Sequence, residues 1–286
     1  MGPFNLGAWK YDYIYTDDDK GIQWSLDVVS KLMALYGQHP ALYAFEPVNE
    51  PWWGSDYDVL KSYYRQARNI IRDVNPNVIF TFHDGFDFSA SRWNDLFEDN
   101  DMENVVIDTH FYQAWWGASS LQTYCSGYYS LSNGANSIKY PVWVGEWALA
   151  TDVCALWLGG FNDANTAAVY DCEYVDCPAP YLPADTAVDF DRTADSLGPF
   201  GTAKKDNYQH AFIKNGKCAK DSTYFSEADT AILGGCAIRA FNDVVEGHFL
   251  WTFRNELEDR WNYVTAYDKG WLNASNPLPG EEEIYQ

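Results

Sequence analysis

The chain has 286 residues, of which 47% are hydrophobic and 17% aromatic, and a formal charge of −22 from 19 basic and 41 acidic side chains. A surface this acidic repels phosphate backbones and anionic lipid headgroups, so nucleic acid and membrane surfaces are excluded as expected partners. No stretch reaches the roughly 18 apolar residues of a membrane span, whereas the length suits one α/β barrel of about 250 residues.

Five strand-like segments alternate with helical patterns along the chain, which is typical of a parallel sheet built from βα units. The predicted strands are 41–48, 77–83, 105–112, 140–146 and 248–253. Apolar residues recur at helical spacing in 24–36, 59–71 and, less regularly, 228–244. These patterns predict a single α/β domain over residues 1–286, with 155–203 as an elaborated loop on its rim.

Two of the predicted strands end at a glutamate beside aromatic residues. Glu50 follows an apolar run at 41–45, and Glu146 follows a second run at 142–144. Because the carboxyl ends of parallel strands build the site of a barrel, we expect the two carboxylates to face one cavity. Two carboxyl groups are the minimum equipment for cleaving a glycosidic bond, since one donates a proton and the other attacks the sugar.

Residues two apart on a strand share a face, and this rule groups further side chains with the glutamates. It places Asp108, His110 and Tyr112 on one face of their strand, and Val144 on the same face as Glu146. It also groups three aromatic residues near the end of the chain: Phe249, Trp251 and Phe253. Several strands therefore change from apolar to chemically active residues near their carboxyl ends, which favours a functional site there.

Four motifs follow one another along the chain: Asn49-Glu50-Pro51, His110-Phe111-Tyr112, Gly145-Glu146-Trp147 and Trp251, with His83-Asp84-Gly85-Phe86 in support. This ordered set resembles glycoside hydrolase family 5, and within it the fungal-type exo-β-1,3-glucanases. The likeness runs over residues 22–160 and resumes at 245–272. It implies a (β/α)8 TIM barrel that uses neither a cofactor nor a metal, and the absence of close Cys-x-x-Cys pairs agrees with the latter.

The resemblance implies a retaining mechanism with Glu50 as the acid/base and Glu146 as the nucleophile. In such enzymes the carboxyl groups stand roughly 5–5.5 Å apart, so the two cannot easily ionise together. The implied substrate contacts are Asn49 to the sugar 2-hydroxyl, Tyr112 to Glu146, His110 to substrate or acid/base, Trp251 under the reacting sugar and Trp115 at the entrance.

Other polar and aromatic residues have a structural interpretation. We expect Glu46 and Asp108 to pair within the barrel, and we expect His83 to be structural. Trp52 and Trp53 either cover the top of the barrel or contact sugar, and the sequence leaves both readings open.

The position of the motifs departs from the family pattern. The Asn-Glu-Pro motif belongs on the fourth of eight strands, yet here it stands at residue 49. We therefore expect an incomplete barrel in which strands 4–8 are recognisable. The preceding units, expected to supply an arginine near the nucleophile and a histidine near the sugar, have no counterpart in 1–20.

Six cysteines, an even number, predict disulfides of open connectivity in a secreted or cell-wall protein, although no signal peptide is visible in the chain. The predicted function is retaining, exo-acting hydrolysis of β-1,3-glucan by a monomer. Two alternatives stay open: a hydrolase or transglycosylase acting on another β-glucan or glucoside, and a carbohydrate-binding protein without catalysis.

Overall fold

The computed structural model describes residues 20–51, 54–114, 116, 119–151, 213–214, 217–218, 225–242, 244–254 and 259–280. Its helices are α1 (Lys20–Tyr36), α2 (Tyr57–Val74), α3 (Ala90–Trp93), α4 (Leu121–Ala135), α5 (Glu227–Asn242) and α6 (Tyr263–Asp268), with short 3-10 turns at Asp99–Asp101 and Asp259–Trp261. Its strands are β1 (Ala44–Phe45), β2 (Ile79–His83), β3 (Val105–Phe111), β4 (Val142–Trp147), β5 (Ile213–Lys214), β6 (Lys217–Cys218) and β7 (Gly247–Leu250).

Five strands form one parallel sheet in the order β1-β2-β3-β4-β7, and β5 and β6 form a separate antiparallel pair. The sheet is strongly curved. Tyr43, just before β1, stacks on Trp143 of β4 with ring centroids 6.4 Å apart, although β2 and β3 lie between these strands. Such a contact requires the inner face of the sheet to close on itself, as the wall of a barrel does.

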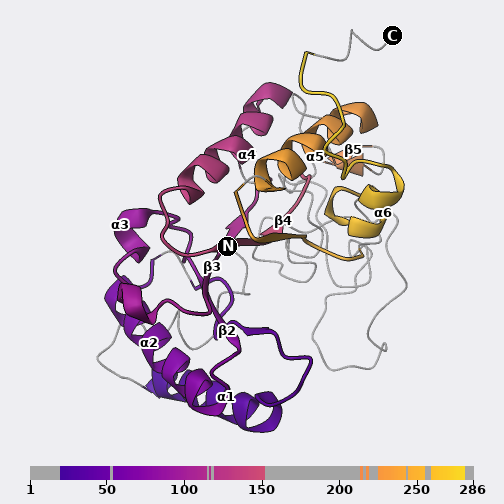
Figure 1. Cartoon of the computed structure of the whole chain (residues 1–286). Helices are drawn as coiled ribbons and strands as arrows, with labels where there is room; N and C mark the ends of the chain where they lie inside the picture. Colours follow the sequence, from indigo (N-terminus) through magenta and orange to yellow (C-terminus); the bar gives the residue numbers. More distant parts are fainter. Residues whose placement is uncertain are drawn as a thin grey trace, which may run out of the picture.

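Helices cover the outer face of the sheet in two groups, α1 and α2 at one end and α4, α5 and α6 at the other (Figure 1). The first group shares a buried apolar cluster with β2, and α4 and α5 share a second one with β4. A disulfide between Cys125 and Cys236 joins α4 to α5, as the even cysteine count led us to expect. The side chains of the other four cysteines lie outside the described residues.

Helix α2 fixes the strand ends that carry the site. It begins after Asp56, whose side chain accepts hydrogen bonds from the backbone N–H groups of Asp58 and Val59 and so satisfies the open first turn. Two buried tyrosines of this helix then reach the sheet: Tyr63 donates to the carbonyl of Pro47 at 3.0 Å, and Tyr64 donates to the carbonyl of His83 at 2.8 Å. The backbone leading into Glu50 and the end of β2 are thereby tied to one helix.

The observed elements confirm the five predicted strands in kind and order, although β1 is shorter than predicted. The three predicted helices correspond to α1, α2 and α5. Helix α4 was not predicted, because its sequence holds two glycines and three serines and shows only a weak apolar stripe. The predicted rim loop at 155–203 lies outside the described residues. No helix in the described part of the chain is long and apolar enough to cross a membrane.

The prediction that Val144 and Glu146 share one face of their strand was wrong. Val144 is fully buried in the cluster with α4 and α5, whereas Glu146 faces the other way and contacts Tyr112 and His110. The pairing of β4 with β3 skips Gly145, so that Thr109 pairs with Val144 but His110 pairs with Glu146. This irregularity adds one residue to β4 and reverses the alternation between Val144 and Glu146.

Candidate active site

Glu50 and Glu146 meet at a single nitrogen atom. His110 Nδ1 lies 2.6 Å from Glu50 Oε1 and 3.5 Å from Glu146 Oε2. These two oxygens are therefore no farther apart than the sum of the two distances. The carboxylate side chains are 20% and 22% exposed, so both groups remain open to solvent, whereas the His110 side chain beneath them is 1% exposed.

The backbone at Glu50 is in the left-handed region, with φ at +46°. A non-glycine residue adopts this conformation rarely, and such strain is concentrated at functional sites because the surrounding structure has to hold it. Here the segment is held from below by the bond between Tyr63 and Pro47. The turn directs the Glu50 side chain toward β3 rather than along its own strand.

Tyr112 contacts Glu146 through its hydroxyl and Trp261 through its ring. The Tyr112 hydroxyl donates to Glu146 Oε2 at 2.6 Å. Its ring packs on the buried Trp261, with centroids 5.4 Å apart, and Trp261 packs in turn on the half-buried Trp251 at 5.8 Å. Burial raises the pKa of Glu146, while the charge of His110 and the Tyr112 hydrogen bond act to lower it.

His110 is held between two carboxylates. Its Nε2 atom lies 3.2 Å from Asp108 Oδ2, on the side of the ring opposite Glu50. Burial acts to lower the pKa of His110, but the hydrogen bonds to Asp108 and Glu50 and the neighbouring negative charges overcome it and raise the pKa to about 10. The ring is therefore an imidazolium at neutral pH and donates one N–H to each carboxylate.

His83 lies against the site without joining its hydrogen bonds. Its ring meets that of His110 edge to face, with centroids 4.4 Å apart. Glu50, His83 and His110 each offer an atom that could ligate a metal, all within 4.8 Å of one another. However, His83 Nδ1 accepts the N–H of Gly85 at 2.9 Å, which places the ring proton on Nε2 and leaves no lone pair for a metal. The donor set fits a metal poorly.

The structure brings together Glu50, Glu146, His110 and Tyr112, as the sequence predicted. Asn49 is exposed beside Glu50, and Trp251 lies one ring away from Tyr112. Trp115, Trp52 and Trp53 lie outside the described residues, so their predicted sugar contacts stay predictions.

Asp108 is the residue whose part in the site the sequence analysis did not recognise. It pairs with Glu46 as predicted, but it also contacts His110 and the backbone of Gly145. Its position two residues before His110 on the same strand was the available signal, since alternation points both side chains to one face.

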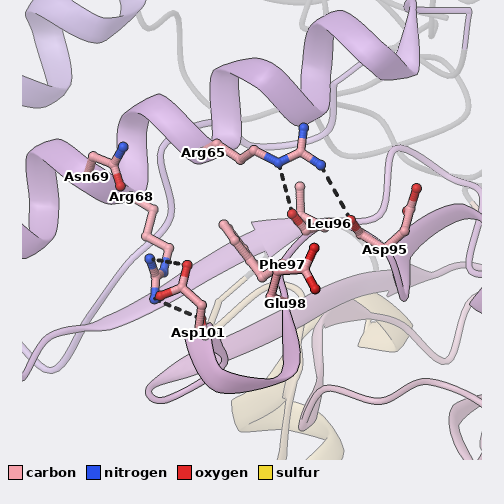
Figure 2. Close-up of a pocket in the computed structure, with 8 residues that line it drawn as sticks. All are labelled: Arg65, Arg68, Asn69, Asp95, Leu96, Phe97, Glu98 and Asp101. Atoms are coloured by element: carbon pink, nitrogen blue, oxygen red, sulfur yellow. Dashed lines mark hydrogen bonds and ion pairs between the residues drawn. The ribbon is translucent and has the colours of Figure 1, made fainter.

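A separate cavity of about 280 Å³ lies on the outer helix layer, between α2 and the segment 95–101 (Figure 2). Its cationic side chains are already paired. Arg65 Nε donates to the carbonyl of Leu96 at 2.9 Å, and Arg68 makes an ion pair with Asp101 at 2.5 Å. None of its lining residues belongs to the carboxylate site.

Comparison with known proteins places the chain in a family. The model of the family described as Cellulase (glycosyl hydrolase family 5) matches residues 5–171. A protein named probable glucan 1,3-beta-glucosidase A, from Aspergillus niger, is 34% identical over 171 residues, which are 54% of this chain and 39% of that protein. The glucan 1,3-beta-glucosidase of Blumeria graminis is 27% identical over 243 residues, which are 79% of this chain and 47% of that protein. The chain thus spans less than half the length of these two relatives.

Solved structures show the same fold. A structure titled AoRut superposes with a TM-score of 0.57 at 17% identity, over 93% of this chain and 59% of that one. The rutinosidase from Aspergillus niger superposes with a TM-score of 0.53 at 18% identity, over 91% of this chain and 60% of that one. These likenesses and the curved parallel sheet confirm the predicted α/β barrel class, of which the described residues supply five strands. The family match covers more than half of the chain and includes both glutamates, and the chain therefore belongs to glycosyl hydrolase family 5.

Proposed function

We propose that this protein is a retaining glycoside hydrolase that cleaves β-1,3-glucosidic bonds and releases glucose from the ends of glucan chains. The observation that carries the proposal is the contact of both Glu50 and Glu146 with His110 Nδ1, at 2.6 and 3.5 Å. Retaining enzymes hold their two carboxyl groups roughly 5–5.5 Å apart, and two oxygens that share one nitrogen neighbour suit that spacing.

In the first step, Glu146 attacks the anomeric carbon while Glu50 gives its proton to the glycosidic oxygen. The bond between the anomeric carbon and the glycosidic oxygen breaks, and a glycosyl-enzyme forms on Glu146. The hydrogen bonds favour this division. His110 donates to Glu50 Oε1, which leaves Oε2 to carry the proton toward the substrate. The Tyr112 hydroxyl donates to Glu146 Oε2 and so favours the ionised form of Glu146, which has to be the nucleophile.

In the second step, water replaces the first leaving group. Glu50, now ionised, takes a proton from the water as its oxygen attacks the anomeric carbon, and the bond to Glu146 breaks. Two inversions at one carbon leave the β configuration unchanged. His110 stays bonded to Glu50 Oε1 through both steps and keeps that carboxylate in one orientation.

The substrate class rests on the named relatives and on charge. Both curated relatives carry the name glucan 1,3-beta-glucosidase, at 34% and 27% identity. A neutral polysaccharide is not repelled by a protein of charge −22, whereas an anionic one would be. We expect the exposed Asn49, next to Glu50 in the chain, to bond the sugar 2-hydroxyl. The disulfide and the fungal relatives support secretion or attachment to a cell wall.

The test is turnover of a substrate panel by the full-length protein, with Glu146→Ala as the inactive control. The panel holds laminarin, cellulose, mannan and aryl β-glucosides. Proton NMR of the first product should show β-glucose from laminarin, and end-reduced laminarioligosaccharides should shorten by one unit at a time.

Other outcomes would identify the rival functions. Faster turnover of cellulose or mannan would replace the substrate assignment, and products longer than the substrate would identify a transglycosylase. Laminarin binding without turnover by a folded protein would instead favour a carbohydrate-binding protein and overturn the proposal.

A further inference from the structure

Asp108 contacts two residues that adjoin the glutamates, His110 beside Glu50 and Gly145 before Glu146. It lies on β3, with a side chain that is 5% exposed. Its Oδ2 atom is 3.2 Å from His110 Nε2, and its Oδ1 atom accepts the backbone N–H of Gly145 at 2.6 Å. One of these neighbours holds Glu50, and the other directly precedes Glu146 in the chain.

The approach of Asp108 to β4 is possible only because residue 145 is glycine. A Cβ atom at Gly145 would lie 2.3 Å from Asp108 Oδ2 and 2.4 Å from Oδ1, well inside van der Waals contact. The pairing of β3 with β4 is also irregular at this residue. The carboxylate of Asp108 therefore occupies the space in which a side chain of residue 145 would lie.

A third donor completes the surroundings of Asp108. Burial, together with the charge of Asp108, raises the pKa of Glu46 to about 9, so Glu46 is a neutral carboxyl group that donates to Asp108. Glu46 Oε1 has no hydrogen-bond partner among the described residues. The Asp108 side chain thus accepts hydrogen bonds from donors on three segments: Glu46, His110 and Gly145.

We propose that Asp108 is a positioning residue that sets the geometry of both glutamates at once, Glu50 through the imidazole of His110 and Glu146 through the backbone of Gly145. This rests on the proposed function for its effect on turnover. Its effect on His110 is independent of it. A displacement of about 1 Å in a reacting group can slow catalysis on the order of 100-fold, so loss of a contact shared by both groups should be severe.

The test on turnover uses Asp108→Asn in the full-length protein, with laminarin and 2,4-dinitrophenyl β-glucoside as probes. Asn keeps the size of the side chain but removes its charge and presents an N–H group to one neighbour. We expect kcat on laminarin to fall on the order of 100-fold, and the first-step rate on the glucoside, measured as the burst of dinitrophenolate, to fall by a similar factor.

The dinitrophenyl glucoside separates the effect of Asp108 on Glu50 from its effect on Glu146. Dinitrophenolate leaves without a proton, so a variant that disturbs Glu50 alone would cleave this glucoside at the wild-type rate in the first step. Recovery of that rate in Asp108→Asn, or an unchanged kcat on laminarin, would overturn the proposal. The matched control is Asp95→Asn, which removes the partner of the buried Lys61 at 2.6 Å in the outer helix layer. It should lower stability and leave kcat unchanged.

A double-mutant cycle tests the contact with Gly145. Gly145→Ala should lower kcat because the added Cβ displaces the Asp108 carboxylate. In the Asp108→Ala background that collision is absent, so the same substitution should cause no further loss. Equal losses in the two backgrounds would show that Asp108 does not determine the requirement for glycine.

A titration of His110 remains decisive if the wild-type protein hydrolyses neither substrate, an outcome that would remove the proposed function alone. Nitrogen-15 NMR should find the wild-type imidazole charged up to about pH 10 and the Asp108→Asn imidazole losing its proton at lower pH. The same titration in both proteins would overturn the role of Asp108. The charged and titratable groups that face His110 are Glu50, Glu46, His83, Asp84, Asp108 and Glu146.

Discussion

Tyr112 donates its hydroxyl proton to Glu146 Oε2 over 2.6 Å, and the two residues come from the carboxyl ends of neighbouring strands. The bond acts against burial, which by itself makes Glu146 a weaker acid and a less available nucleophile. The Tyr112 ring also packs on Trp261, which packs in turn on Trp251. The ionised state of Glu146 that the mechanism requires is therefore favoured by the hydrogen bond from Tyr112 and opposed by burial.

Tyr112→Phe should lower kcat roughly 10- to 100-fold, since a hydrogen bond to a charged group contributes about 1.5–3 kcal/mol. The pKa of Glu146 should rise further, because one of the two contacts that lower it is lost. The acidic limb of the kcat/KM profile should consequently move to higher pH. Tyr140→Phe is the control, since its hydroxyl bonds the N–H of Phe97 away from the site. A limb at the wild-type pH would contradict this account of Tyr112.

Glu50→Gln should separate the acid role from the base role. Hydrolysis of laminarin should fall by several orders of magnitude, because a poor leaving group needs the proton. With 2,4-dinitrophenyl β-glucoside the first step should survive and the second should slow, which gives a burst of dinitrophenolate followed by a low steady rate. Stopped-flow absorbance measures both phases. Equal losses on the two substrates, without a burst, would exclude Glu50 as the acid/base.

Glu46→Gln should change the dependence of stability on pH. The folded-state pKa of Glu46 is raised from 4.5 to about 9, so the folded protein holds a proton that the unfolded chain releases above pH 4.5. Wild-type stability therefore falls as the pH rises through this window. Glutamine keeps a donor toward Asp108 and cannot ionise. The variant should gain on the wild type with rising pH, reaching a few kcal/mol, as measured by urea unfolding at mildly acid and mildly alkaline pH. A constant difference would show that Glu46 is not protonated in the fold.

Replacement of both members of the Cys125–Cys236 disulfide by alanine should destabilise the pairing of α4 with α5. The disulfide closes a loop of 111 residues in sequence, and a loop of this size restricts the unfolded chain by about 4–5 kcal/mol in the chain-entropy model. Urea unfolding should show a loss of this order, while kcat at low temperature should stay near the wild-type value because neither cysteine contacts the site. An unchanged unfolding free energy would mean that the disulfide does not constrain the unfolded chain.

Much of the sheet could be predicted from the sequence, because each strand is an apolar run bounded by turn residues and the runs alternate with helices. Strand alternation also predicted that Asp108, His110 and Tyr112 share one face, and the contacts of these three side chains confirm that face. Helix α4 could not be predicted from local propensity. Its glycines and serines disfavour a helix, and burial of Tyr124 and Tyr128 against the neighbouring helix and strand overrides them.

The face of Glu146 was predicted for the wrong reason. Simple alternation grouped it with Val144, but the irregular pairing at Gly145, where Asp108 accepts the backbone N–H, separates the two. Such a contact joins residues 37 apart in the sequence and has no local signature. The pairing of Glu46 with Asp108 was predicted, whereas the connection of that pair to both glutamates required the fold.

The central claim is that Glu146 becomes covalently bonded to sugar while Glu50 supplies and removes the proton. The most direct measurement is incubation of the full-length protein with 2,4-dinitrophenyl 2-deoxy-2-fluoro-β-glucoside, whose fluorine slows the second step and traps the glycosyl-enzyme. Peptide mass spectrometry should then find one fluoroglucosyl group, on Glu146, and release of dinitrophenolate equal to the amount of protein. A label on another residue, or turnover of laminarin with inversion at the anomeric carbon and no label, would contradict the account.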